Sequence, residues 1–417
     1  MPVMRVAIIG GGSAGLSMAQ QLLQVGPGRF APVIFECRER VGGLWNYEYP
    51  PGPCTVHSSS APQPRTTGYA EWEGMPVSAM YDGLYTNIAS DLMAFRDTPF
   101  PPGTPLFPQR AQVLDYLETF ARDAGILQYV RLHTEVERVA REAKNPSRWR
   151  VSSKSLATGA RSDEEFDYVV AASGRCSTPN VPNVVGVEHF RGIKLHSAWY
   201  RFPEEFAGKR VLVVGSNSSG GDIARELCGG VKRTYPGSAA WNAACSTTVY
   251  QSYRHPELPP PMDYDPRSPD SPEWCRRIQV VGAITHITPE GTVMTATGES
   301  LCVDVIIWAT GFLYCFPYLD HSVEPFKSQP VIPSNGDDHT VVAADACAAT
   351  VPHNLDDWLL FYRHDNSLCF LGLPNRIVPF PMSQLQSRYV PAYQNCRPHL
   401  ARKDTQHAAC AVLACRK

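Results

Sequence analysis

The first forty residues alternate between apolar runs and a glycine-rich turn. Residues 6–9 are Val-Ala-Ile-Ile, Gly-Gly-Gly-Ser-Ala-Gly follows at 10–15, and a helix-like segment begins at Leu16. A second apolar run, residues 33–35, leads to Glu36 about 20 residues after the turn. This order predicts a strand, a tight turn, a helix and a parallel strand, the unit that opens a dinucleotide-binding fold.

The residues of this turn suit a pyrophosphate. Glycines allow the tight bend and let backbone N–H groups approach a phosphate at the positive end of the following helix. A carboxylate at the end of the second strand accepts hydrogen bonds from ribose hydroxyls, and Glu36 has that place. We therefore expect a dinucleotide to contact Gly10, Gly12, Ser13, Ala14, Gly15 and Glu36.

A second turn of the same kind follows an apolar strand at residues 210–214. Asn217 stands where the middle glycine is expected, but small hydroxyls and amides can still line a phosphate. Residues 223–227 have the pattern of the helix that should come next. Two nucleotide sites in one chain predict two cofactors that exchange electrons, and hence an enzyme. The expected second set is Gly215, Ser216, Asn217, Ser218, Ser219 and Gly220.

Two further apolar strands end in similar turns, Ala-Ser-Gly at 172–174 and Ala-Thr-Gly at 309–311. Because they resemble each other as the two nucleotide folds do, the second fold is predicted to be inserted into the first. The fold class is therefore α/β, with two Rossmann-like dinucleotide-binding domains. Apolar residues at helical spacing predict a helix over 111–124, and alternation predicts strands at 129–139 and 148–153.

The composition indicates a soluble protein of two or three domains. The 417 residues are 43% hydrophobic and 19% charged with a net charge of −2, so no basic surplus favours nucleic acid or an anionic membrane. No apolar run approaches the roughly 18 residues of a membrane span, and the early strand leaves no room for a signal peptide. The 13 cysteines form no C-x-x-C pair, which predicts no metal site. We expect a cytoplasmic protein.

Several motifs resemble those of class B flavin monooxygenases, in the flavin-containing monooxygenase branch. Residues 190–200 form an F-x-G-x3-H-x3-Y pattern that ends at Tyr200, where the Baeyer–Villiger branch has Trp. Residues 309–312, Ala-Thr-Gly-Phe, are similar to a late motif of the family, and residues 81–87 to its segment with the active-site Asn. The resemblance runs in order over about residues 4–395.

The resemblance implies FAD in the first fold and NADPH in the second. It implies that FAD forms a C4a-hydroperoxide with O2, and that Asn87 holds NADP⁺ and the oxygenated flavin together. Arg254, in a Ser-x-Arg motif, would grip the 2′-phosphate of NADPH, with Lys232 and Arg233 as rival cations. Further contacts to the flavin are expected from Gly43, Leu44, Trp45 and Thr86.

The expected domains are residues 1–195 (FAD-binding, first part), 196–311 (NADPH-binding insert), 312–395 (FAD-binding, closing part) and 396–417 (a tail of uncertain order). His196 lies at the joint between two of them. It is either a hydrogen-bonding residue near the flavin or a structural histidine that joins the domains. The stretch 234–247 and the tail depart from the family pattern.

These features predict a monooxygenase, dependent on FAD and NADPH, that oxygenates a nucleophilic S or N atom of a small molecule. Tyr200 disfavours the alternative of Baeyer–Villiger carbon oxidation. The lack of a dithiol beside the first fold disfavours an NAD(P)H-dependent disulfide or quinone reductase. A flavin-binding redox sensor without catalytic activity is a further alternative. The expected partners are the substrate and O2, with no nucleic acid or membrane, and a homodimer is compatible with the sequence.

Overall fold

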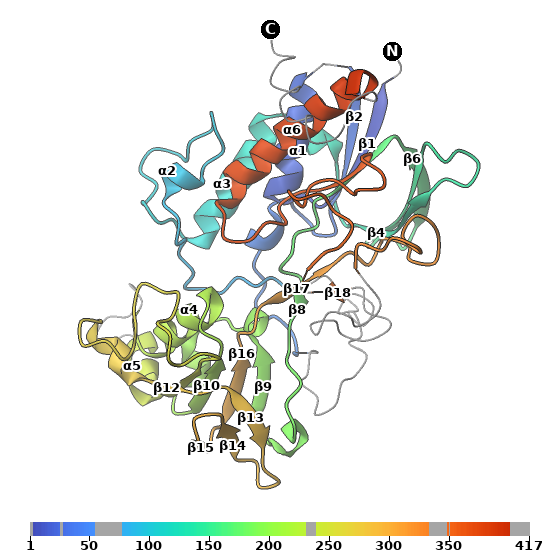
Figure 1. Ribbon diagram of the computed structural model, residues 1–417. Helices are drawn as coiled ribbons and strands as arrows, with labels where there is room; N and C mark the ends of the chain where they lie inside the picture. Colours follow the sequence, from blue (N-terminus) through green and yellow to red (C-terminus); the bar gives the residue numbers. More distant parts are fainter. Residues whose placement is uncertain are drawn as a thin grey trace.

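A computed structural model describes residues 3–25, 28–54, 77–230, 239–332, 348–349 and 351–400. Figure 1 shows two lobes, one above the other, joined near strands β8 and β17. Both the beginning and the end of the described chain belong to the upper lobe, and the middle of the chain forms the lower one. The lower lobe is therefore inserted into the upper one.

The upper lobe is built on a parallel five-stranded sheet with strand order β19-β7-β1-β2-β3. The helices α1, α3 and α6 pack on one face of it, with α6 beside α1 (Figure 1). These elements are β1 (Met4–Ile9), β2 (Phe30–Phe35), β3 (Val130–Arg131), β7 (Tyr168–Ala171), β19 (Leu368–Phe370), α1 (Ser13–Val25), α3 (Arg110–Asp123) and α6 (Pro379–Leu400). The short helix α2 (Ser90–Met93) lies near α6.

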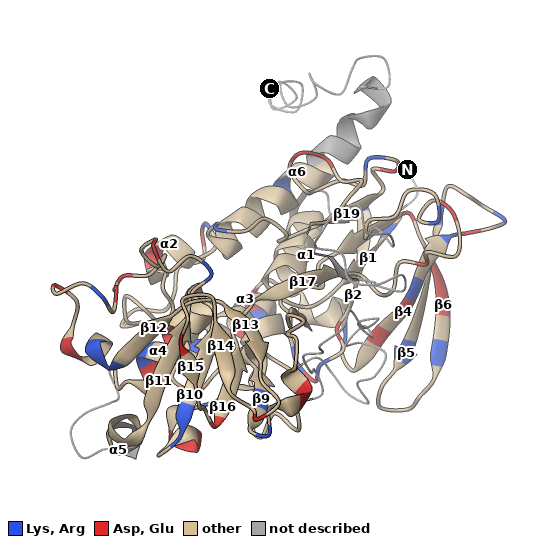
Figure 2. Cartoon of the chain, turned by 60° about the horizontal axis from the view of Figure 1, so that its bottom comes forward, with Lys and Arg blue, Asp and Glu red and all other residues tan. Residues whose placement is uncertain are grey.

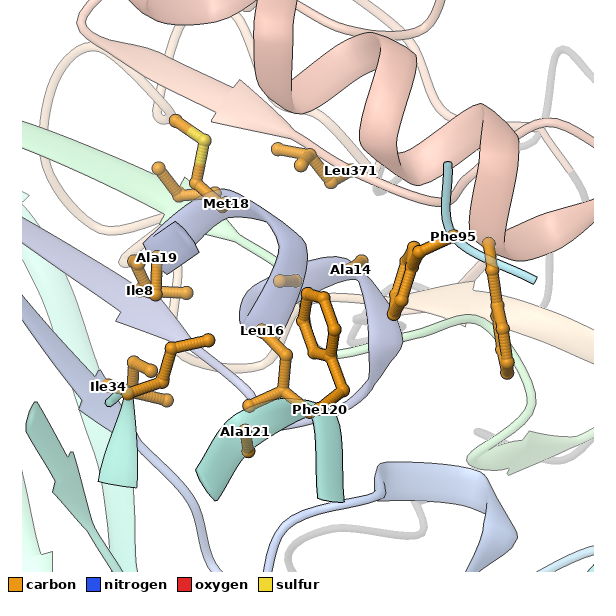
Figure 3. Packing of buried hydrophobic residues seen from close by; sticks show 14 of the residues in the cluster. Ile8, Ala14, Leu16, Met18, Ala19, Ile34, Phe95, Phe120, Ala121 and Leu371 are labelled. Atoms are coloured by element: carbon orange, nitrogen blue, oxygen red, sulfur yellow. The ribbon is translucent and has the colours of Figure 1, made fainter. Parts of the chain in front are cut away.

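Alternation along β1 divides the upper lobe into two cores. Val6 and Ile8 face the helices, whereas Ala7 and Ile9 face the other side of the sheet. Figure 3 shows the helix side, where side chains from α1, α3 and the sheet interdigitate around Leu16. Because β1 is buried on both faces, every position from 6 to 9 is apolar, as expected for a central parallel strand.

An antiparallel sheet of β4 (Thr134–Arg141), β5 (Trp149–Ser155) and β6 (Arg161–Phe166) covers the second core. Its outer surface carries interspersed cations and acids (Figure 2), including the pair Arg161–Glu137 at 2.8 Å. The predicted single strand over 129–139 is divided between β3 and β4. The cause is His133, which adopts a positive φ of 50° between them and so turns the chain.

The lower lobe repeats the architecture of the upper lobe. Its parallel sheet has the order β12-β11-β10-β16-β9, and helices α4 and α5 accompany it. The elements are β9 (Ile193–His196), β10 (Arg210–Val214), β11 (Thr248–Ser252), β12 (Ile278–Val281), β16 (Val305–Trp308), α4 (Ser218–Leu227) and α5 (Ala239–Ser246). A small antiparallel sheet adds β13 (Ile284–Ile287), β14 (Val293–Thr295) and β15 (Ser300–Leu301).

The predicted α/β fold with two Rossmann-like units is confirmed. The two chain segments that connect the lobes contain short strands that pair with each other, β8 (Thr178–Pro179) and β17 (Phe312–Cys315). Strand β17 also pairs with β18 (Ala348–Ala349). The exact domain limits stay a prediction, and the limit between 195 and 196 passes through β9. Helix α6 continues to Leu400, and residues 401–417 and 234–238 lie outside the described residues.

His196 is a structural residue at the joint between the lobes. Its side chain is fully buried, and Ala198 N–H donates to Nδ1 at 3.2 Å. Nδ1 is therefore unprotonated, and Nε2–H donates to the carbonyl oxygen of Gly311 at 2.9 Å. This bond ties the end of β9 to the Ala-Thr-Gly turn that follows β16. Burial lowers the pKa of His196 to about 4, so the ring is neutral at pH 7.

Protonation of His196 should make the protein less stable in mild acid. The unfolded chain takes up the proton near pH 6.5 and the folded protein only near pH 4, so stability falls as the pH drops through this window. The loss amounts to about 3 kcal/mol at its end. In urea unfolding, we expect a smaller loss between pH 7.5 and pH 5 in His196→Gln than in the parent. Equal losses in both proteins would contradict this role.

Candidate functional site

A cavity of about 290 Å³ lies where the strands of the upper sheet end. Four neighbouring strands, β19, β7, β1 and β2, place the residues after their carboxyl ends on its wall. Parallel α/β sheets bind ligands at this edge. The lining includes the predicted residues Gly10, Gly12, Ser13, Ala14, Glu36, Gly43, Leu44 and Trp45.

The glycines of the first turn have different structural reasons. Gly10 has a φ of 110°, and a Cβ there would lie 2.4 Å from the carbonyl oxygen of Ala172. A Cβ at Gly15 would lie 2.0 Å from the carbonyl oxygen of Gly10, so Gly15 lets α1 pack against the turn. A Cβ at Gly12 would meet no protein atom closer than 3.5 Å. Gly12 is thus a bare stretch of cavity wall, which a bound pyrophosphate can approach closely.

Glu36 is fixed at the edge of this cavity. It is 4% exposed, and its Oε2 accepts a hydrogen bond from the Gly11 N–H at 2.7 Å. Its Oε1 accepts from the Arg38 N–H at 2.9 Å. Oε1 also accepts from the Cys37 thiol at 3.5 Å, whereas Oε2 keeps a further lone pair, so Glu36 can accept from a ribose hydroxyl through Oε2 without losing these contacts.

The turn at Gly43–Trp45, a short 3-10 helix, forms a second wall of the cavity. It packs directly on the first turn, because the Gly42 N–H donates to the Gly11 carbonyl oxygen at 2.9 Å. The ring of Trp45 meets Phe380 edge to face, with centroids 6.3 Å apart. The Leu44 carbonyl oxygen accepts from the Ser78 hydroxyl at 2.6 Å, which connects this turn to the segment that leads to Asn87.

Two helices begin at the cavity. Helix α1 starts at Ser13 and α6 at Pro379, and both residues line the wall. The positive ends of two helix dipoles therefore face one site, which favours a ligand with negative charge. Gln386 of α6 fixes the segment that follows β19, because its Oε1 accepts a hydrogen bond from the Gly372 N–H at 3.0 Å.

The second turn, in the lower lobe, repeats the contacts of the first. Gly215 has a φ of 123°, and a Cβ there would lie 2.4 Å from the carbonyl oxygen of Ala309. A Cβ at Gly220 would lie 2.2 Å from the carbonyl oxygen of Gly215, as at Gly15 and Gly10. Asn217 and Ser218 are exposed at the start of α4, within reach of a ligand, and Ser216 and Ser219 are half-buried beside them.

The acid of the first fold has no counterpart in the second. The Gly10 N–H donates to the last residue of β2, just before Glu36, and the Gly215 N–H donates to the last residue of β11, just before Tyr253. Tyr253 thus occupies the place of the carboxylate. Arg254 follows it, is exposed, and has no ion pair with the residues that the structure describes. Lys232 and Arg233 lie outside the described residues.

Thr86 and Asn87 do not line the cavity. They lie further along the segment that lines it at Val77 and Ser78. Thr86 is buried, and its hydroxyl donates to the Ile88 carbonyl oxygen at 2.9 Å. Asn87 is exposed, and within the described part of the chain its side-chain amide makes no hydrogen bond. Its donor and acceptor are therefore available to a ligand.

Several lining residues were not expected from the sequence, among them Arg38, Arg175 and Tyr318. The Tyr318 hydroxyl lies 2.9 Å from the Ser173 hydroxyl, and burial raises the pKa of Tyr318, so it stays neutral. The Ala-Ser-Gly turn in the sequence could have indicated Ser173 as a lining residue, but no local pattern connects Ser173 with Tyr318. Burial raises the pKa of the Cys37 thiol to about 12, so this lining cysteine is no reactive thiolate.

The described ranges contain no group of three or more His, Cys, Asp or Glu side chains that could hold a metal ion. No helix in the same ranges is long and apolar enough to cross a bilayer.

Exchanges at Gly12 and Gly15 should separate ligand binding from folding. Gly12→Ala has room in the protein and should melt within about 2 °C of the parent, yet bind FAD at least tenfold more weakly, because a methyl group on the cavity wall would hinder the close approach of the pyrophosphate. Gly15→Ala forces a 2.0 Å contact and should lower the melting temperature by several degrees. Melting curves of the FAD-free proteins and FAD titration measure both. Full FAD affinity in Gly12→Ala would contradict the assignment.

The fold has two units of the dinucleotide-binding type, with a cavity at the sheet edge of the first, and comparisons with known proteins give the class of protein. Residues 68–241 match the family model described as flavin-binding monooxygenase-like. The chain is 30% identical over 400 residues to flavin-containing monooxygenase FMO GS-OX5 of Arabidopsis thaliana, covering 93% of this chain and 73% of the relative. The chain therefore belongs to the flavin-containing monooxygenase family.

Solved structures show the same fold. S-allyl-L-cysteine S-oxygenase from Allium sativum has a TM-score of 0.71 and 27% identity, and the match covers 99% of this chain and 81% of that one. Tmm from Pelagibacter sp. strain HTCC7211 has a TM-score of 0.70 and 23% identity, over 97% of this chain and 78% of that one.

The protein is accordingly a flavin-dependent monooxygenase whose cofactors are FAD and NADP(H). The chain's own cavity fits FAD, because it joins an open glycine wall, two helix N-termini and a fixed carboxylate. Membership in this family favours a monooxygenase over the disulfide or quinone reductase and over the non-catalytic sensor. The cytoplasmic location and the homodimer stay predictions.

Proposed function

We propose that this protein uses NADPH and O2 to oxygenate a nucleophilic heteroatom of a small molecule, with sulfur as the preferred atom and nitrogen as the second. The observation that carries the proposal is the likeness to S-allyl-L-cysteine S-oxygenase over 99% of the chain. That relative is named for sulfur oxygenation. This chain shares its fold at 27% identity, which supports the same class of reaction here.

The first fold supplies the environment of the flavin. Backbone N–H groups at Gly12–Ala14 and the start of α1 bind the pyrophosphate, and Glu36 accepts from the ribose. The turn at Gly43–Trp45 shields the ring system together with Phe380. FAD, once bound, supplies the hydride acceptance and O2 activation that no side chain provides.

The cavity limits water and proton leakage around the flavin. Its wall includes Leu371 and Phe380, which are buried and apolar, and burial holds the Cys37 thiol and the Tyr318 phenol that reach it in their neutral forms. Apolar and neutral side chains of this kind exclude water and protect a reactive oxygen species from premature loss as H2O2, while the charged residues of the lining, such as Glu36 and Arg38, suit the polar parts of the cofactor. This is the contribution that a monooxygenase site must make beyond binding its cofactors.

Asn87 is proposed to contact NADP⁺ and the reacting oxygen. Its amide can donate and accept at once, does not titrate, and has no hydrogen-bond partner among the described residues. These properties suit a residue that holds two ligands together at any pH of activity. The support is its exposure at the end of the segment that also lines the cavity at Ser78.

Arg254 is proposed to select NADPH over NADH. An acid after β11 would repel the 2′-phosphate, but Tyr253 stands there, and Arg254 follows with an exposed guanidinium that has no ion pair among the described residues. Arg254→Ala should raise the NADPH KM by roughly ten- to a hundredfold, which corresponds to the 1.5–3 kcal/mol of a charge-assisted bond. The NADH KM should stay nearly constant. Arg254→Lys, the matched control, should lose less.

Steady-state kinetics with both nucleotides measure this selectivity. An unchanged ratio of the NADPH KM to the NADH KM in Arg254→Ala would contradict the role of Arg254 and would assign the 2′-phosphate contact to Lys232 or Arg233 instead.

The proposed function is tested by O2 uptake of the FAD-loaded protein with NADPH and a substrate panel of thiols, sulfides, amines and ketones. We expect sulfides to accelerate NADPH oxidation at least tenfold and to give one oxygenated product per NADPH. Turnover of ketones alone would establish the Baeyer–Villiger alternative. Anaerobic reduction of a disulfide or a quinone without O2 uptake would establish a reductase.

A further inference from the structure

Two tyrosines bind two carboxylates of the same helix at the seam between the lobes. The Tyr81 hydroxyl donates to Asp222 Oδ2 at 2.9 Å, and the Tyr200 hydroxyl donates to Glu226 Oε2 at 2.7 Å. Asp222 and Glu226 are one turn apart on α4 and so share a face of the helix. We call these four residues the tyrosine–carboxylate cluster.

Three of the four residues are shielded from water, which strengthens the hydrogen bonds of the cluster, and Asp222 is half-buried. Tyr81 is 8% exposed, Glu226 is 1% exposed, and Tyr200 is fully buried. The two rings meet edge to face with centroids 5.8 Å apart. Burial raises the pKa of Tyr81 and of Asp222, and the bond between them partly offsets the rise at Asp222. A buried carboxyl that loses its donor pays the full cost of desolvation.

The cluster connects the two nucleotide sites. Helix α4 begins at the second glycine turn, so its position sets the position of a bound NADP(H). Tyr81 lies three residues after Ser78 on the cavity wall and six residues before Asn87. The backbone of its segment is fixed on both sides, by Asp82 N–H to the Arg201 carbonyl oxygen at 2.9 Å and by Thr86 N–H to the Pro108 carbonyl oxygen at 2.9 Å.

Tyr200 has a different place in the chain although its chemistry is the same. It belongs to the connection before β10 and stacks on Phe206, with centroids 5.7 Å apart, inside the core of the lower lobe. Its bond to Glu226 therefore anchors α4 to its own lobe. The hydroxyl of Tyr81, by contrast, joins the segment of Asn87 to that helix.

We propose that the Tyr81–Asp222 hydrogen bond is a latch that holds the Asn87 segment at a fixed distance from the NADP(H)-binding helix. Tyr81 and Asp222 are positioning residues for the proposed reaction, and this inference rests on the proposed function of the two sites. The latch keeps the distance between the nicotinamide of NADP⁺ and the Asn87 amide constant until the substrate binds.

Variants on both sides of the bond test the latch in the FAD-loaded protein. Tyr81→Phe removes the donor, and Asp222→Ala removes the acceptor from the other lobe. Asp222→Asn keeps an oxygen that accepts from Tyr81 and should restore the parent behaviour. Tyr200→Phe is the matched control, since it removes an equivalent bond one helical turn away and leaves the Asn87 segment attached.

Calorimetry with NADP⁺, hydrogen–deuterium exchange over residues 81–90 and the fraction of NADPH oxidised to H2O2 are the three measurements. Tyr81→Phe and Asp222→Ala should bind NADP⁺ at least about fivefold more weakly, exchange faster over 81–90, and release more H2O2. Tyr200→Phe should lower the melting temperature comparably, with exchange over 81–90 and NADP⁺ affinity as in the parent. Asp222→Asn should stay within twofold of the parent.

Equal effects of Tyr81→Phe and Tyr200→Phe, or parental exchange over 81–90 in both latch variants, would overturn the proposal. Should Tyr81→Phe fail to fold, the comparison of Asp222→Ala with Asp222→Asn decides. A parent protein that does not bind NADP⁺ would refute the proposed function instead. In that case faster exchange over 81–90 in the latch variants still supports the latch, and unchanged exchange still rejects it.

Discussion

One buried guanidinium, that of Arg201, fixes the seam on which the two nucleotide sites depend. Its side chain is 0% exposed, and a charge in such a place is tolerated only when its donors are satisfied. It donates at 2.7–3.3 Å to the backbone carbonyl oxygens of Glu48, Ser78, Met80, Ala198 and Tyr200. The Glu48 oxygen belongs to the chain after the turn at Gly43–Trp45, and those of Ser78 and Met80 belong to the segment that leads to Asn87. The oxygens of Ala198 and Tyr200 belong to the connection before β10.

The rest of the seam follows from this constraint. Arg201 binds the carbonyl oxygens of residues 78 and 80, which places Tyr81 next to α4. The same contact places Ser78 where its hydroxyl binds the turn at Gly43–Trp45. On the opposite side His196 ties the second lobe to the Ala-Thr-Gly turn through its neutral ring. The seam is thus made of polar side chains that bind backbone atoms, as Arg201 and His196 do, or other side chains, as Tyr81 does. Such contacts specify geometry, whereas the apolar cores on either side supply most of the stability.

The parts of the site that lie in one local stretch could be predicted from the sequence. Gly10, Gly15 and Glu36 are needed by the backbone geometry of a strand, turn and helix, so their spacing carries the signal. The repeat of that spacing at Gly215 and Gly220 predicted the second fold in the same way. The inserted arrangement followed from the two similar turns after β7 and β16.

Contacts between distant segments could not be predicted, because no local pattern encodes them. Tyr81 and Asp222 are separated by 141 residues, and Ser173 and Tyr318 by 145. Arg201 follows directly on the motif at residues 190–200, but arginine side chains are mostly exposed, and no local pattern indicates its five carbonyl partners. The roles of Asn87 and Arg254 stay predictions, since both side chains are exposed and are placed to meet ligands rather than protein.

The central claim is that the two sites act together to place one atom of O2 on a nucleophilic heteroatom. Mass spectrometry of the product formed from a dialkyl sulfide, NADPH and isotopically labelled O2 tests it most directly. The account predicts a sulfoxide that carries one labelled oxygen atom for each NADPH oxidised, with little H2O2. A sulfoxide oxygen that derives from water, or NADPH oxidation that delivers all the O2 as H2O2 with every sulfide and amine, would contradict it.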